Sequence, residues 1–242
     1  MVEAHIELGL PASSGQLILE RRWRIAMKYL KEFSAHNRIL DLGCGNASQT
    51  TFFLNEFGSV VGLDYVHLKH EDVSKSSGNF FFVRGDAVTL PFADEVFDVV
   101  TSFEVLEHVG NDCQAVCEVH RILKPKGIFI LSVPNKWWLF ESHGACVKGF
   151  NWLPWNRIPF VSWLPKGIHS RIAKARIYTI KKMRMIAEDA GFSVKSYGYI
   201  TAPLDVLPDG YLRRTLRKTM FSADETKIPF LAVNLYLVCE KT

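Results

Sequence analysis

The sequence predicts an α/β fold in which helices cover both faces of a mostly parallel sheet. Short apolar runs alternate with segments of helical periodicity along the chain, and this order is typical of strands joined by crossover helices. The first run, at 38–42, leads directly into two glycines one residue apart, Gly43 and Gly45, and then into an amphipathic segment. At 242 residues the chain (1–242) suits a single domain with an insertion.

We expect seven strands, at 38–42, 59–63, 79–84, 97–102, 128–133, 192–199 and 229–239. Helices are expected at 14–35, 47–57, 111–123 and 179–190, with a short one between 65 and 78. The Pro and Gly of 124–127 are interpreted as the stop signal of one helix, and Gly191 as the glycine that ends another. The last two strands are joined by a long connection without a helical pattern, and we expect them to form an antiparallel hairpin.

The composition favours a cytoplasmic protein. No stretch of about eighteen apolar residues is present, so no segment is expected to cross a membrane. Charged residues between 20 and 24 interrupt the apolar run that a secretory signal requires. The five cysteines show no spacing typical of a zinc site, and we expect them to be reduced thiols.

The Gly-x-Gly turn between a strand and a helix predicts a nucleotide site. Glycine has no Cβ, so a ligand can lie against the backbone, and the N–H groups at the start of the next helix point to the same place. A dinucleotide site requires a third glycine, but Ser48 stands at that position. The carboxylate of Asp41 on the preceding strand would also repel a pyrophosphate.

The D-x-G-x-G pattern of Asp41, Gly43 and Gly45 resembles the first motif of class I S-adenosylmethionine-dependent methyltransferases. This resemblance implies a Rossmann-like fold, in which a seven-stranded, mostly parallel sheet has an antiparallel last strand. It also implies S-adenosyl-L-methionine (SAM) as the cofactor, a nucleoside with an amino-acid tail and no phosphate. An acidic group near the turn suits the ammonium of that ligand.

Two further strand ends fit the same resemblance. Asp64 ends the second strand about 20 residues after the turn, where an acidic side chain accepts from both ribose hydroxyls. Tyr65, the next residue, is expected to pack on the ribose or the adenine. Asp86 and Ala87 follow the third strand, and in the methyltransferases an Asp at this place accepts from the adenine amino group.

The loop after the fourth strand passes the sulfonium end of the cofactor in the methyltransferases. We therefore expect Phe103 and Leu106 to line the methionine and adenine side of the cofactor. His108 is the candidate catalytic base for a hydroxyl acceptor, because an imidazole titrates near neutral pH.

The same loop resembles a metal-binding segment. Glu104, Glu107 and His108 have a spacing that places them on one face if the loop starts a helix. This triplet, with a further histidine, holds a divalent cation in small-RNA 2′-O-methyltransferases, and His169 is a candidate for the fourth ligand. Because Glu-His at this place also occurs in relatives without a metal, we assign no metal from the sequence.

An insertion at 134–178 interrupts the alternation of strands and helices. It holds five of the six tryptophans, and the window 142–187 contains nine basic residues and no acidic one. We expect a substrate lid over the carboxyl ends of the strands, suited to an apolar or anionic acceptor. The alternatives are an aromatic cover for the sheet edge, peripheral membrane contact through 137–182, and nucleic-acid binding, which ranks last because no recognised module is present.

These features together predict a SAM-dependent methyltransferase whose partner is a small-molecule or lipid-like acceptor. Residues 164–169 and the aromatic stretch before them resemble the ubiquinone-pathway O-methyltransferases, which act on polyprenylated phenols at a membrane. The alternatives are a nucleoside-binding scaffold without activity and a membrane-peripheral interaction protein. The acceptor, the methylated atom and the oligomeric state stay open.

Overall fold

The computed structural model describes residues 15–31, 37–66, 78–145 and 158–242. Over these residues the strands form one eight-stranded sheet with the order β3-β2-β1-β4-β5-β8-β6-β7. The strands are β1 Arg38–Leu42, β2 Ser59–Asp64, β3 Phe80–Arg84, β4 Phe97–Phe103, β5 Leu123–Pro134, β6 Phe192–Thr201, β7 Glu225–Thr226 and β8 Ala232–Lys241. β1 to β5 pair in parallel, and β8 lies antiparallel between β5 and β6.

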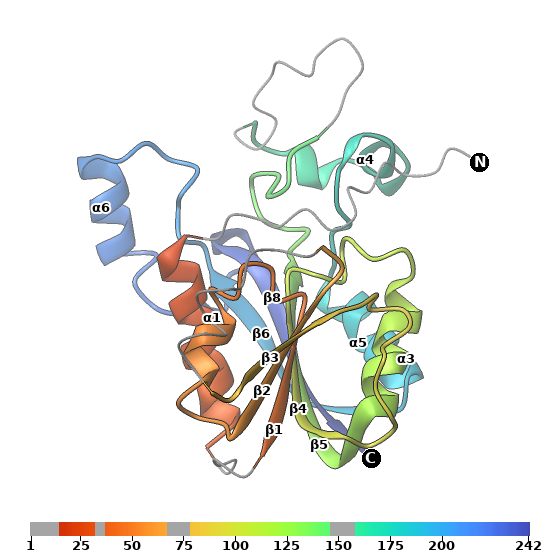
Figure 1. Ribbon diagram of the computed structural model, residues 1–242. Helices are drawn as coiled ribbons and strands as arrows, with labels where there is room; N and C mark the ends of the chain where they lie inside the picture. The colour runs from red at the N-terminus through yellow and green to blue at the C-terminus, as the bar shows by residue number, and fades with distance from the viewer. Residues whose placement is uncertain (1–14, 32–36, 67–77, 146–157) are drawn as a thin grey trace.

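Helices lie on both faces of this sheet, as expected (Figure 1). The α-helices are α1 Gln16–Tyr29, α3 Asp112–Ile122, α4 Lys166–Ile172, α5 Ile180–Asp189 and α6 Tyr211–Lys218. Short 3₁₀ helices are η1 Thr50–Phe53, η3 Val161–Trp163 and η4 Pro229–Leu231. α1 lies on one face, while α3 and α5 lie together on the other (Figure 1).

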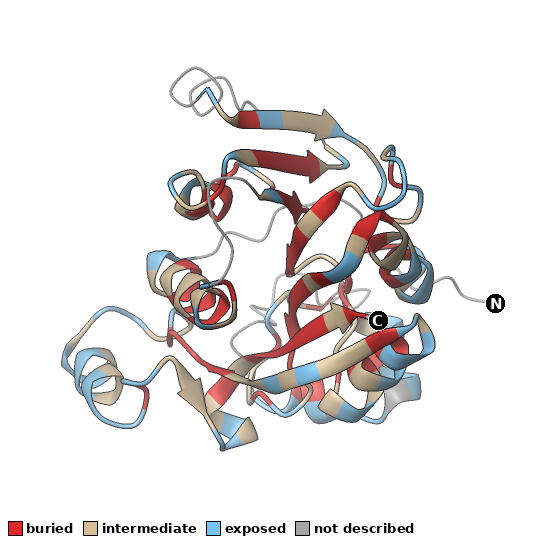
Figure 2. Ribbon diagram, turned by 90° about the horizontal axis from the view of Figure 1, so that it is seen from below, coloured by how far each residue is buried: buried red, intermediate tan, exposed pale blue. Residues whose placement is uncertain are grey.

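The sheet separates two apolar clusters, so the central strands are buried on both sides. On β1, Ile39 packs into the cluster beneath α1, whereas Leu40 and Leu42 pack into the cluster beneath α3 and α5. Figure 2 shows the buried residues concentrated along the strands and on the helix sides that face them. This double burial explains why the first strands read as continuous apolar runs rather than as alternating patterns.

The expected mostly parallel sheet and the antiparallel last strand are confirmed, but the expected count of seven strands was wrong. The additional strand, β7, is two residues long and pairs with Tyr199 and Ile200 of β6. Two residues carry no periodicity, so the sequence gives no signal for it. The prediction that the connection between β6 and β8 lacks a helix was also wrong, since it contains α6. The short helix expected between 65 and 78 lies largely outside the described residues.

One helix and one strand have other boundaries than the sequence predicts, because local hydrogen bonds or strand pairing override the sequence pattern. The helix expected at 47–57 is reduced to turns around η1. Asn46 accepts from the backbone N–H and the hydroxyl of Ser48, and such a local turn competes with helix formation. β5 begins at Leu123, within the stretch interpreted as a stop signal, and its register shifts against β4 between Phe97 and Val99.

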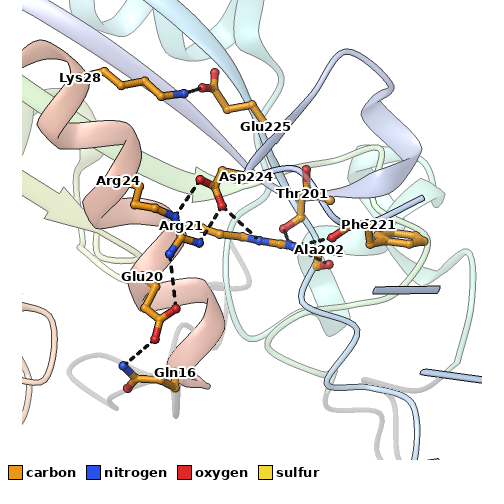
Figure 3. A network of polar contacts seen from close by, with 10 residues as sticks. All are labelled: Gln16, Glu20, Arg21, Arg24, Lys28, Thr201, Ala202, Phe221, Asp224 and Glu225. Carbon is orange, nitrogen blue, oxygen red and sulfur yellow. Dashed lines mark hydrogen bonds and ion pairs between the residues drawn. The ribbon is translucent and has the colours of Figure 1, made fainter. Parts of the chain in front are cut away.

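A buried arginine fixes α1 against the chain that follows β6. The guanidinium of Arg21 donates to the carbonyl oxygens of Thr201, Ala202 and Phe221 (Figure 3). Arg24, on the next turn of the same helix surface, forms a two-pronged hydrogen bond with Asp224 at 2.7 and 2.8 Å. These contacts join segments about 180 to 200 residues apart in sequence.

We predict that Arg21→Met destabilises the fold by about 3 kcal/mol, because buried carbonyl groups lose their donor. Urea unfolding measures the change. The control is Lys28→Met, which removes the more exposed ion pair with Glu225 (Figure 3) and is expected to cost less than about 1 kcal/mol. Equal losses for the two variants would contradict this assignment.

Candidate active site

The glycine turn after β1 is held by backbone hydrogen bonds to the end of β2. The N–H groups of Gly43 and Cys44 both donate to the carbonyl oxygen of Leu63, at 2.7 and 3.1 Å. Gly43 has a φ of +74°, and a Cβ placed on it would lie 2.1 Å from Cγ2 of Val105. Glycine is therefore required at this position both by the backbone angle and by the close approach of the loop after β4.

Asp64 connects this turn to the end of β2. Its Oδ2 accepts from the N–H of Gly45 at 2.8 Å, and its Oδ1 accepts from the N–H of Val66 at 3.0 Å. The side chain is half-buried, so the carboxylate is fixed by the backbone while one edge stays accessible. A carboxylate has about four acceptor sites, and two of them remain for the hydroxyls of a ligand.

Asp41 lies beneath the turn and faces inward. Its carboxylate is buried and accepts from the hydroxyls of Thr50 at 2.6 Å and Thr101 at 2.9 Å. Burial raises the pKa of Asp41 to about 6, against an ordinary value of 3.8. Its two hydrogen bonds connect β1 to β4 and to η1, so within the described residues it supports the turn from below.

Asp86 and Ala87 sit at the end of the neighbouring strand. β2 and β3 are paired through Asp64 and Arg84, which brings Asp86 to the same edge of the sheet as Asp64. The carboxylate of Asp86 is exposed and accepts from the N–H of Val88 at 3.1 Å. The Ala87 side chain is buried in the core. Tyr65 is 54% exposed, so its ring is free of the core.

The loop after β4 divides into buried apolar and buried polar residues. Phe103 is nearly buried, and its ring lies 6.0 Å from the guanidinium carbon of Arg22. Leu106 is fully buried in the core, while its carbonyl oxygen accepts from the hydroxyl of Tyr178 at 3.1 Å. The side chains of Phe103 and Leu106 are therefore less accessible to a ligand than we expected from the sequence.

Four side chains converge beside Phe103, and we call them the carboxylate–histidine cluster: Glu104, Glu107, His108 and His143. Nε2 of His143 lies 3.5 Å from Glu104 and 3.6 Å from Glu107. The rings of His108 and His143 pack edge to face, with 4.7 Å between their centres. Glu107, His108 and His143 have the composition and mutual distances of a metal-binding group.

Sequence reasoning missed His143. The expected fourth histidine, His169, instead contacts Glu141 at 2.7 Å, and Glu141 also accepts from the backbone N–H of His143 at 3.5 Å. Both histidines lie in the insertion at 134–178, and their sequence spacing does not indicate which of them lies beside the loop after β4. Only the fold shows that the chain after β5 returns His143 to the loop after β4.

Burial governs the charges of the carboxylate–histidine cluster. It raises the pKa of Glu104 and raises that of Glu107 further, because Glu104 adds a second negative charge nearby. Burial also lowers the pKa of His143, which favours the neutral imidazole. Arg22, buried beside Glu104 at 3.5 Å, supplies positive charge at this place.

The insertion brings several aromatic side chains to the surface. Trp163 stacks near Phe160 and Phe230, with ring centres 5.0 and 5.4 Å apart, and Trp137 lies 6.4 Å from Phe230. All four are exposed, whereas Trp138 is buried. Trp152 and Trp155 lie outside the described residues. Within the described part of the chain, no helix has the length and hydropathy needed to span a bilayer.

Residues 40–131 match a family of methyltransferase domains. This segment therefore resembles a methyltransferase domain. It contains most of β1, the glycine turn, the ends of β2 and β3, and the loop after β4, while Arg22 and His143 lie outside it. The expected resemblance to SAM-dependent methyltransferases is thereby confirmed.

Curated proteins that match this chain are named as methyltransferases. A probable S-adenosylmethionine-dependent methyltransferase of Mycolicibacterium smegmatis is 31% identical over 116 residues, 48% of this chain and 45% of that protein. The mitochondrial ubiquinone biosynthesis O-methyltransferase of Arabidopsis thaliana is 25% identical over 174 residues, 69% of this chain and 50% of that protein. The chain spans about half the length of the curated relatives it matches.

Solved structures share the fold over nearly the whole chain. A SAM-dependent methyltransferase from Mesorhizobium loti superposes with a TM-score of 0.62 at 19% identity, covering 92% of this chain and 100% of that one. A Burkholderia thailandensis N-methyltransferase bound to S-adenosylhomocysteine has a TM-score of 0.60 at 16% identity, covering 93% and 78%. The [4+2]-cyclase SpnF reaches 0.64 at 16% identity, covering 99% and 86%. The Rossmann-like methyltransferase fold is thus confirmed.

The buried carboxyl group of Asp41 should make stability depend on pH. In the folded protein the pKa of Asp41 is about 6, above the ordinary 3.8. Its contribution to the free energy of unfolding is therefore complete below about pH 4 and is lost as the pH rises through about 6. The full loss is about 3 kcal/mol.

Between about pH 4 and pH 6.5, we therefore expect the free energy of unfolding to fall less steeply in Asp41→Asn than in the unmodified protein. Urea titrations at each pH measure both slopes. Asp189→Asn, on the exposed end of α5, is the control and should keep the original slope. An Asp41→Asn slope identical to that of the control would show that Asp41 does not titrate as described.

Proposed function

We propose that this protein transfers the methyl group of SAM to a small or lipid-like acceptor that is apolar or anionic. The observation that carries the proposal is the carboxylate of Asp64, fixed against the N–H of Gly45 in the glycine turn with acceptor capacity remaining. A diol such as a ribose can donate two hydroxyl hydrogen bonds to such a carboxylate. The match to methyltransferase domains supports the same ligand.

The binding roles follow from the strand ends. We assign the ribose hydroxyls to Asp64 and the adenine amino group to Asp86, whose exposed carboxylate stands at the adjacent strand end. Tyr65 packs against the nucleoside, with Ala87 supporting the turn beneath it. Gly43 and Gly45 let the ligand approach the backbone, and Asp41 adds negative charge below the amino-acid tail.

The reaction places modest demands on the protein. SAM supplies an activated methyl group, which an acceptor atom attacks in line while the sulfur keeps the electron pair of the broken bond. The protein then contributes positioning and exclusion of water. Phe103 provides apolar surroundings at the loop after β4, and Leu106 fixes that loop to the core. His108 accepts the acceptor's proton when that acceptor is a hydroxyl.

A cavity of about 400 Å³ beside this loop supports an anionic or apolar acceptor. Its walls combine the apolar Leu164, Ala173 and Ile177 with the cationic Lys136, Arg176 and Lys182. The acidic Asp112 also lines it and lies 3.7 Å from Lys182, which leaves an excess of positive charge. Arg176 also donates to the carbonyl oxygens of Val109 and Gly110, which ties the cavity wall to the loop after β4. The volume lies in the range of small-molecule sites, and we propose 134–178 as the lid over it.

The exposed aromatic residues Trp137, Phe160, Trp163 and Phe230 favour a second, compatible role at a membrane surface. Tryptophan is suited to the interface between lipid and water. Flotation with anionic vesicles tests this role, since a protein that never floats acts on an acceptor delivered in solution.

A scaffold without methyltransferase activity is the main competing function. The structural similarity to SpnF, which is described as a cyclase, illustrates that this fold carries other reactions. The carboxylates of Asp64 and Asp86 at the same edge of the sheet favour cofactor binding, but cofactor binding alone does not distinguish a methyltransferase from an inactive scaffold. Release of S-adenosylhomocysteine in the presence of a candidate acceptor does.

We predict that Asp64→Ala weakens SAM binding by about 1–3 kcal/mol, or about 5- to 150-fold, because two charged hydrogen bonds to the ligand are lost. Isothermal titration calorimetry measures the affinity. Asp189→Ala removes a carboxylate from the surface of α5 and should bind as the unmodified protein does. If Asp64→Ala binds SAM with unchanged affinity, the proposed placement of the ribose is wrong.

A further inference from the structure

The cavity of about 400 Å³ beside the loop after β4 has more positive than negative charge in its wall. Among the described residues that line it, Lys136, Arg176 and Lys182 are cationic and Asp112 is acidic. His169 also lines the cavity, but its ring meets the buried Glu141 at 2.7 Å, so that carboxylate has a partner of its own. An excess of positive charge around a cavity favours an anionic ligand.

Two of the three cations are already engaged by the protein. The ammonium of Lys182 lies 3.7 Å from Asp112 and 4.5 Å from the centre of the Tyr178 ring, so its charge is largely balanced. The terminal nitrogens of Arg176 donate to carbonyl oxygens of the loop after β4 at 2.5 and 2.8 Å. Arg176 therefore contributes charge to the cavity but has few donors left for a ligand.

Lys136 is the cation whose donors are unused. Its ammonium lies 5.9 Å from the centre of the Trp137 ring and forms no ion pair or hydrogen bond with a described residue. Its backbone is nevertheless fixed, because its N–H donates to the carbonyl oxygen of Tyr178 at 2.9 Å. The side chain of the preceding Asn135 also donates to two carbonyl oxygens between 229 and 232. Lys136 thus offers three N–H donors from a fixed position in the chain.

The rest of the cavity wall suits a ligand with an apolar body. Leu164, Ala173 and Ile177 supply apolar surface. Thr179 lines the cavity as the N-cap of α5, and the first turn of that helix holds no acidic residue. The start of α5 therefore adds to the positive potential and does not oppose it. The ligand that matches this wall combines an apolar body with an anionic group.

We propose that this cavity binds an oxyanion group of the methyl acceptor, a carboxylate or a phosphate, and that Lys136 selects it. The identity of the ligand as a methyl acceptor rests on the proposed function, whereas the binding of an anion does not. Arg176 joins the cavity to the loop that carries His108, so an acceptor held by its anionic group has its other end toward that loop. The acceptor class thereby narrows to organic acids and phosphate esters with an apolar body.

Three probes with the same ring system separate charge from apolar contact: 2-naphthoate, 2-naphthyl phosphate and the neutral 2-naphthamide. Ligand-observed NMR titrations with the whole protein measure their dissociation constants, at low ionic strength because salt screens the interaction. We expect at least one of the two anions to bind about tenfold more tightly than the amide. The anion that binds more tightly identifies the carboxylate or the phosphate as the preferred group.

We expect Lys136→Met to weaken binding of that anion about tenfold and to leave the affinity for 2-naphthamide unchanged. Lys181→Met is the matched control, because it removes the same charge from an exposed position of α5 outside the cavity wall. It should bind the anion as the unmodified protein does. Circular dichroism and the melting temperature confirm that both variants fold.

Asp112→Asn is expected to have the opposite effect. It removes the acidic partner of Lys182 and should tighten anion binding about two- to fivefold. A gain in affinity cannot arise from misfolding, so this variant separates a role in ligand binding from a purely structural one.

The proposal is overturned if neither anion binds more tightly than 2-naphthamide, or if Lys136→Met binds the anion as well as Lys181→Met does. A parallel titration with S-adenosylhomocysteine separates it from the proposed function. Nucleoside binding without a preference for anions rejects the anion site alone. Anion binding without nucleoside binding rejects the methyltransferase function and leaves the anion site standing.

Discussion

The site depends on a single hydrogen bond between neighbouring strand ends, from the N–H of Gly45 to the carboxylate of Asp64. It fixes the glycine turn after β1 relative to the end of β2, and Gly43 reinforces it through the N–H bond to Leu63. Val105 closes the turn from the side of β4, at a distance that admits no Cβ on Gly43. Three strand ends are thereby held in one arrangement, and a preorganised site loses little entropy when the ligand binds.

Several ionisable side chains are buried behind this turn, and most of them have specific hydrogen-bond or ion-pair partners. Asp41 is satisfied by two threonine hydroxyls, and Glu104 by Asn234 and Arg22. Glu107 differs because its oxygens accept no hydrogen bond from the described residues, and the imidazole nitrogens of His108 and His143 lie 4.0 and 3.6 Å from it. Buried carboxylates are tolerated when they are paired or coordinate a cation.

The sequence predicted the parts of the fold that depend on local order, and failed where distant segments meet. Strands β1 to β4 and the glycine turn were predictable because each is a short apolar run with its own punctuation. β7 and α6 were missed, since one is two residues long and the other has no residue buried in the core. Asp64 was predictable from its distance to the turn. His143 was not, because its role arises from the path of the chain after β5, which no spacing encodes.

The most direct measurement is a crystal structure of the protein grown with S-adenosylhomocysteine. Our account predicts that both ribose hydroxyls lie within hydrogen-bond distance of the Asp64 carboxylate, that the adenine amino group faces Asp86, and that the sulfur lies toward Phe103. A nucleoside bound elsewhere, or an Asp64 carboxylate that contacts no part of it, would contradict the account.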